Sequence, residues 1–129
     1  MKVKKNKQKL RILFIEFNLY SGAPEGLLTE IEYLETYHSQ TIDFLIIAHP
    51  KSIIANKKTV LGKRLILIAG EDLGSLKVKP ISTFIRFIQT LFQTFVIAIK
   101  FNPHLIHANH YSWSIYANPI GMLLRKPVL

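Results

Sequence analysis

Short apolar runs alternate along this chain with longer segments in which apolar residues recur every three or four positions. The runs occupy residues 10–17, 42–48, 64–69 and 104–108, and residues 127–129 begin another. Continuous apolar runs of this length are typical of strands buried in a parallel sheet. Strands that alternate with helices predict an α/β fold with a Rossmann-like, doubly wound parallel sheet.

The first helix is predicted to begin at Pro24, a residue that suits the first helical turn because its missing N–H has no partner there. Leu27, Leu28, Ile31 and Leu34 then recur at helical spacing. This apolar face should pack on the sheet.

Residues 81–100 are the longest apolar segment, with Ile, Leu, Phe and Val along one stripe and Ser, Thr, Gln and Arg86 along another. A helix that spans a membrane needs about 20 predominantly apolar residues, and a polar face on it would be unfavourable in the lipid. We therefore expect a helix that packs its apolar stripe on the sheet. A helix lying in the membrane interface is the alternative.

Pro119 allows two interpretations of the last helix. Either a helix that begins near Ser114 is kinked at Pro119, or Asn118 caps a shorter helix whose first residue is Pro119. We favour the second, because it leaves no hydrogen bond broken. The weakly patterned residues 51–63 are expected to be a connection.

Composition indicates one folded domain with an excess of positive charge. The 129 residues are 49% hydrophobic and carry 17 Lys and Arg against 8 Asp and Glu, a net charge of +9. Residues 1–9 hold much of this excess and predict a basic, flexible tail that can attract an anionic membrane or nucleic acid. Arg11 and Glu16 interrupt the first apolar run, which argues against a signal peptide. The absence of Cys excludes disulfides and thiolate chemistry, and it fits a cytoplasmic location.

Two stretches resemble one known family. Asn102-Pro103-His104-Leu105-Ile106-His107-Ala108-Asn109-His110, followed later by Lys126-Pro127-Val128-Leu129, is similar to the end of the N-terminal domain of GT-B glycosyltransferases of family 4 (glycosyl transferase group 1). The first strand, leading through Tyr20-Ser21-Gly22-Ala23-Pro24-Glu25 into a helix, resembles the beginning of that domain. The resemblance covers residues 10–129.

The resemblance implies the acceptor-binding N-terminal portion of a retaining glycosyltransferase. Such an enzyme transfers a sugar from a nucleotide-sugar to a glycan or lipid-linked acceptor, here in cell-envelope polysaccharide synthesis. The family's Glu-x7-Glu donor motif does not occur in this sequence. We therefore expect a truncated domain, incomplete at its C-terminal end and inactive alone.

The resemblance also implies the partners of this chain. These are a sugar acceptor, the missing C-terminal donor domain and, through the Lys-rich N-terminus, the anionic inner surface of the membrane. No cofactor and no nucleic acid partner are expected, and the nucleotide-sugar is a substrate of the full-length enzyme.

The candidate substrate-binding residues come from the same two stretches. Where the family commonly has Gly-Gly-Ala-Glu-Arg, this chain has Gly22-Ala23-Pro24-Glu25-Gly26, so Gly22, Ala23 and Glu25 are candidates while the second Gly and the Arg are absent. His107, Asn109 and His110 occupy the family's His-Ala-His position, with Asn109 in place of the second His. An ordinary turn glycine and a buried strand histidine remain the alternatives for Gly22 and His107, and no catalytic residue is assigned.

Other classes of site find less support in the sequence. His104 and His107 fall on opposite faces of a strand and no carboxylate is near, so no metal site is expected. Dinucleotide, P-loop and hydrolase motifs are absent from the sequence. Two alternatives remain, a stand-alone basic α/β binding module for anionic membrane or nucleic acid, and a receiver-like domain, although Glu16 is the only acid near the end of the first strand.

Overall fold

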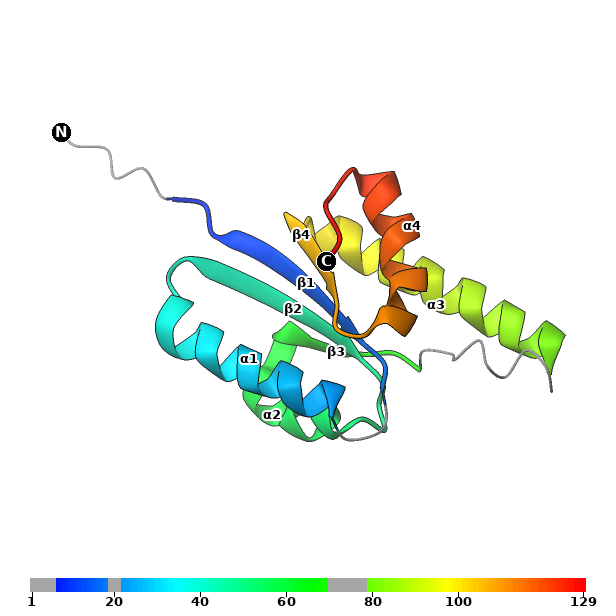
Figure 1. Ribbon diagram of the computed structural model, residues 1–129, viewed down its shortest axis with the longest axis horizontal. Coiled ribbons are helices and arrows are strands. Elements are labelled where there is room, and N and C mark those ends of the chain that lie inside the picture. The colour runs from blue at the N-terminus through cyan, green and yellow to red at the C-terminus, as the bar shows by residue number, and fades with distance from the viewer. Residues whose placement is uncertain (1–6, 19–21, 70–78) are drawn as a thin grey trace.

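A four-stranded, all-parallel sheet forms the centre of the computed structural model, which describes residues 7–18, 22–69 and 79–129. Its strands are β1 (Leu10–Glu16), β2 (Ile42–Ala48), β3 (Leu65–Leu67) and β4 (Leu105–Ala108). They lie in the order β3-β2-β1-β4 (Figure 1). The predicted α/β, Rossmann-like fold is confirmed, although β3 is shorter than its apolar run.

The sheet begins to extend beyond β4 at the end of the chain. Val128 pairs in parallel with Ile106 as an isolated bridge. The Ile106 amide donates to the Pro127 carbonyl (3.0 Å), and the Leu129 amide donates to the Ile106 carbonyl (2.9 Å). The strand predicted at residues 127–129 is present as this one bridge.

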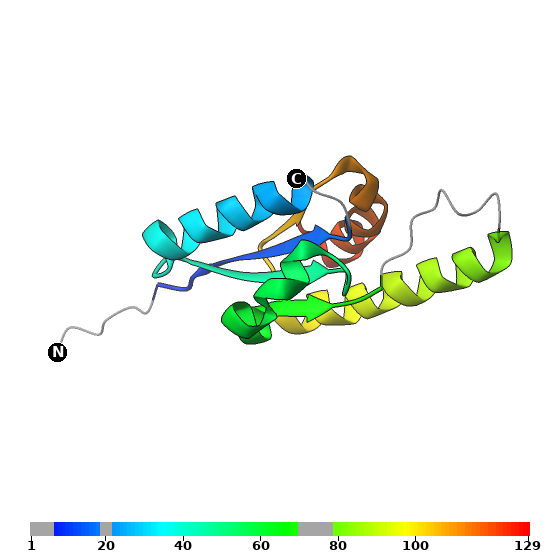
Figure 2. The same cartoon turned by 90° about the horizontal axis from the view of Figure 1, so that it is seen from below.

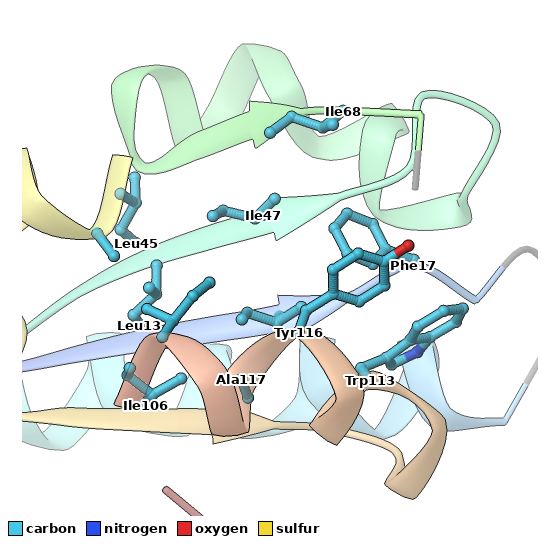
Figure 3. Close-up of a cluster of buried hydrophobic side chains, with 12 residues drawn as sticks. Leu13, Phe17, Leu45, Ile47, Ile68, Ile106, Trp113, Tyr116 and Ala117 are labelled. Atoms are coloured by element: carbon cyan, nitrogen blue, oxygen red, sulfur yellow. The ribbon is translucent and has the colours of Figure 1, made fainter. Parts of the chain in front are cut away.

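Helices cover both faces of the sheet. The helix α1 (Ala23–His38) lies on one face, and α3 (Pro80–Phe101) and α4 (Ser114–Leu124) lie on the other (Figure 2). Successive side chains of β1 point to opposite faces of the sheet. Phe14 therefore packs with α1, while Leu13 packs with the residues of α3 and α4 (Figure 3). The fold is therefore doubly wound, and the predicted face of α1 packs on the sheet, with Leu27 and Ile31 buried.

Residues 51–63 form helical turns, so the expectation of a plain connection is wrong. The turns are η1 (Ile53–Lys57), α2 (Lys58–Leu61) and η2 (Gly62–Arg64). Ser52 begins them with a side-chain cap on the Ile54 amide. Ile54 and Leu61 are buried in the core on the α1 side of the sheet. Two buried apolar residues seven positions apart are too few to show a helical period in the sequence.

The favoured interpretation of Pro119 is also wrong. The helix α4 begins at Ser114, directly after the short turn η4 (Tyr111–Trp113), and Pro119 lies inside it. Tyr116 and Ala117 in its first turns are completely buried. Their packing against the core stabilises a helical start that Pro119 alone would disfavour.

The helix α3 packs on the core with a face that is rotated from the expected apolar stripe. Thr83, Thr90, Thr94 and Ala98 are buried, and Phe87, Leu91 and Phe95 pack partly buried against the core, whereas most of the expected stripe faces solvent. The hydroxyl of Thr90 donates to the Ala69 carbonyl at 3.4 Å, which satisfies one polar group on the buried face. Helical spacing identifies two faces, but it does not say which face meets the sheet.

Candidate functional site

The strand order places a topological switch point between β1 and β4. From β1 the chain moves outward through β2 to β3, and it then returns to place β4 on the other side of β1. Ligands of open α/β sheets bind beyond the carboxyl ends of the strands at such a point. Glu16 ends β1 there and Asn18 follows it, and Asn109 and His110 follow β4.

A buried carboxylate organises this edge. Glu16 is completely buried, and its Oε1 accepts hydrogen bonds from the Asn18 amide (2.8 Å) and from the Trp113 indole (3.0 Å). Its Oε2 accepts a hydrogen bond from Asn109 Nδ2. A carboxylate without solvent requires such donors, and Glu16 obtains them from two segments, the loop after β1 and the connection between β4 and α4.

Asn109 joins the two stretches that the sequence singled out. Its Nδ2 donates to the Ala23 carbonyl at 2.7 Å as well as to Glu16, and its backbone amide donates to the Ile15 carbonyl at 3.1 Å. Ala23 is the first residue of α1. The corner after β4 is therefore held against both the end of β1 and the start of α1.

Gly22 occupies a backbone conformation that requires glycine. It precedes α1 with φ +108° and ψ −91°, a region that side chains with a Cβ rarely adopt. Among the described residues, and apart from its chain neighbours, no atom lies within 4 Å of the position that a Cβ would take. Gly22 is thus needed for the turn, and no described residue fills the space beside it.

The first turn of α1 is a poor site for an anion. Pro24 has no N–H, and the Gly26 amide is already bonded to the Gly22 carbonyl at 2.9 Å. Glu25 adds an exposed carboxylate. Since phosphate sites at helix N-termini depend on free N–H groups and positive potential, this turn disfavours a phosphate or another anion.

His110 is half-buried and oriented by Ser112. Its Nδ1 lies 3.1 Å from the Ser112 hydroxyl and accepts a hydrogen bond from the Ser112 amide at 3.3 Å. A ring nitrogen that accepts from an amide carries no proton, so the neutral ring has its proton on Nε2.

His107 does not join this corner. It lies within β4, with its ring 5.2 Å from that of Phe14 and its Nδ1 3.9 Å from Glu30 Oε1 in α1. His104 lies beyond the other end of β4, where its Nδ1 accepts from the Arg11 amide at 2.9 Å. The structure thus unites Gly22, Ala23, Asn109 and His110 at one edge and leaves His107 apart.

Metal coordination finds no basis at this edge. Within residues 7–18, 22–69 and 79–129, no group of three or more His, Cys, Asp or Glu side chains is placed to hold a metal ion. The polar atoms brought together here are amide, imidazole and hydroxyl groups around a carboxylate that is already satisfied.

Sequence reasoning missed two residues of the site. Glu16 is the only acid in the first apolar run. An acidic residue at the end of a buried strand indicates that other groups of the protein pair with it, because charged side chains are almost never fully buried unless paired. Trp113 is the only tryptophan, and nothing in its local sequence indicates that its indole reaches Glu16, 97 positions away.

Comparisons of the chain with protein-family models, curated proteins and solved structures found no match. Residue types and their positions are therefore the basis for assigning a function. The most specific feature is the hydrogen bond from Asn109 to the Ala23 carbonyl, which joins the loop after β4 to the start of α1.

Proposed function

We propose that residues 10–129 are the acceptor-binding N-terminal portion of a retaining GT-B glycosyltransferase of the family 4 type. The enzyme would transfer a sugar from a nucleotide-sugar to a glycan or lipid-linked acceptor in cell-envelope polysaccharide synthesis. One observation supports this above the others: the Gly22-Ala23 turn and the Asn109-His110 corner meet at the switch point, bonded to each other. Both occupy positions that match the family's motifs.

The groups at this edge suit the hydroxyls of a sugar. Asn109 Nδ2 is committed to Glu16 and Ala23, so its Oδ1 is the part of the amide that can accept from an acceptor hydroxyl. His110 adds a half-buried imidazole at the same corner. The space beside Gly22 that no described residue fills allows a ligand to approach the backbone closely. In this proposal Glu16 positions Asn109 and does not contact the sugar.

The chain alone is expected to show no sugar transfer. The proposal assigns donor binding to a second domain, which carries the Glu-x7-Glu motif absent from this sequence. Incubation with nucleotide-sugars and saccharide acceptors should release no nucleoside diphosphate above the rate without protein. Transfer by this chain as the only protein would contradict the assignment of its role.

Acceptor binding can be tested by NMR with a panel of short hexose and N-acetylhexosamine oligosaccharides. We expect chemical-shift changes at the amides of Gly22, Ala23 and His110. The variant His110→Ala should bind about fivefold to tenfold more weakly, the effect of losing one hydrogen bond worth about 1 to 1.5 kcal/mol.

The matched control for this titration is His38→Ala, which changes a histidine at the far end of α1 and should leave the affinity unchanged. Shifts confined to residues remote from the switch point would refute acceptor binding at this edge, as would an equal loss of affinity in both variants.

The DNA downstream of the Leu129 codon tests the two-domain part of the proposal. We expect it to encode a further segment with a Glu-x7-Glu motif in one of the reading frames. Unrelated sequence there would instead favour a stand-alone binding module.

A further inference from the structure

The outer face of α3 is a long apolar surface without cover in the described part of the chain. The large side chains on it are between 45% and 77% exposed, and they are Ile81, Phe84, Ile85, Ile88, Phe92 and Ile99. With 22 residues at about 1.5 Å each, the helix is about 33 Å long. An exposed apolar surface of this kind marks an interaction site.

The surface continues onto α4, which lies beside α3 (Figure 1). A groove of about 230 Å³ separates the two helices and is lined almost wholly by apolar side chains, including Phe92, Phe95 and Leu123. Leu123, which lines this groove, and Met122, the preceding residue of α4, are themselves exposed. The apolar surface is therefore a two-helix patch, which we call the α3–α4 face.

The charged residues of α3, of α4 and of the segments between and after them are all basic. From residue 79 to the end, the sequence contains no Asp or Glu, and its charged side chains are Lys79, Arg86, Lys100, Arg125 and Lys126. The acidic residues Glu25, Glu30, Glu32 and Glu35 are on α1, which covers the opposite face of the sheet (Figure 2). A helix that combines a large apolar face with basic residues is typical of membrane-surface binding.

We propose that the α3–α4 face docks this domain on an anionic phospholipid bilayer, with α3 lying in the plane of the interface. Its apolar side chains would enter the boundary between headgroups and acyl chains. The surrounding lysines and arginines would contact anionic headgroups. This inference does not depend on the glycosyltransferase proposal.

Two other occupants fit the structure less well. The helix is apolar enough to cross a membrane by length and composition, but its other side, with Thr90, Thr94 and Ala98, is buried in the fold. Spanning the bilayer would require unpacking that side. A second copy of the chain would bring together two pairs of helices whose own charged residues are all basic, and like charges oppose such a contact.

Vesicle co-sedimentation of the full chain tests the proposal. Vesicles of phosphatidylcholine mixed with phosphatidylglycerol should bind the protein, vesicles of phosphatidylcholine alone should bind it far more weakly, and added salt should reduce binding. The double variant Ile85→Ser/Phe92→Ser should lower the affinity for the mixed vesicles at least about tenfold, because both side chains enter the acyl region.

The matched control is Tyr33→Ser/Tyr37→Ser, which removes two exposed aromatic residues from the acidic helix α1 and should change the affinity by less than about twofold. A second control variant is Lys2→Gln/Lys4→Gln/Lys5→Gln. It should bind the mixed vesicles with most of the affinity of the unsubstituted chain, in contrast to Ile85→Ser/Phe92→Ser. Circular dichroism of each variant checks that it is folded.

Three results would overturn the proposal. The first is undiminished binding by Ile85→Ser/Phe92→Ser, and the second is loss of binding only when the N-terminal lysines are replaced. The third is a dimer in light scattering that the α3 variant converts to monomer, since this would assign the face to a second copy of the chain.

Discussion

Replacement of Glu16 by alanine is expected to lower the free energy of unfolding by about 3 kcal/mol. The variant leaves the buried Trp113 indole and the Asn18 amide without their acceptor, and an unsatisfied buried donor costs about 1 to 3 kcal/mol. Asn109 loses one of its two Nδ2 contacts, which loosens the corner after β4. Urea denaturation followed by the fluorescence of Trp113, the only tryptophan, measures the change.

Two variants calibrate this result. Glu16→Gln keeps an oxygen for Trp113 and Asn18 but sets an amide group against Asn109 Nδ2, so its loss of stability should be smaller than that of Glu16→Ala. Glu32→Ala removes an exposed acid from α1 and should change the free energy of unfolding by no more than about 0.5 kcal/mol. If Glu16→Ala were as stable as the unsubstituted chain, the buried network would not be what holds this edge together.

Truncation of Tyr116 to alanine should cost about 3 to 5 kcal/mol, the range for removing a large buried aromatic ring. Tyr116 is completely buried, and its ring centroid lies 5.2 Å from that of Phe17 and 5.1 Å from that of Phe87 (Figure 3). The ring therefore joins the end of β1, α3 and α4 in one cluster. Thermal unfolding by circular dichroism provides the measurement.

The conservative variant Tyr116→Phe separates packing from hydrogen bonding. It keeps the ring and removes only the hydroxyl, so we expect a loss near 1 kcal/mol, well below that of the alanine variant. Tyr37→Ala, at an exposed position of α1, controls for loss of an aromatic residue as such. Equal stability of Tyr116→Ala and Tyr37→Ala would show that α4 is not anchored through this ring.

The two proposals concern different parts of the fold and can fail separately. Acceptor binding depends on the loops after β1 and β4, whereas membrane docking depends on the outer surface of α3 and α4. The variant His110→Ala should leave vesicle binding unchanged, and Ile85→Ser/Phe92→Ser should leave oligosaccharide binding unchanged. Each variant therefore serves as the control for the other experiment.

The sequence alone determined the strands, the first helix and the fold class. A buried strand of a parallel sheet is read directly from a continuous apolar run, and α1 from an apolar face with Pro24 at its first turn. The loops that follow β1 and β4 were also identified by sequence, because strand ends and turn residues are local features. The sequence predicts Gly22 as a substrate-binding residue with an ordinary turn glycine as the alternative, and its positive φ shows that it does form a turn that requires glycine.

Tertiary structure decided everything that depends on which surfaces meet. The spacing in α3 defines an apolar and a polar stripe, yet the face that meets the core combines Thr90, Thr94 and Ala98 with Phe87 and Leu91, and it leaves most of the apolar stripe outside. The start of α4 depends on the burial of Tyr116, which outweighs the local preference of Pro119 for a first position. The buried network joins Glu16 to Asn109 and Trp113, 93 and 97 positions later, and no local pattern encodes contacts over such separations.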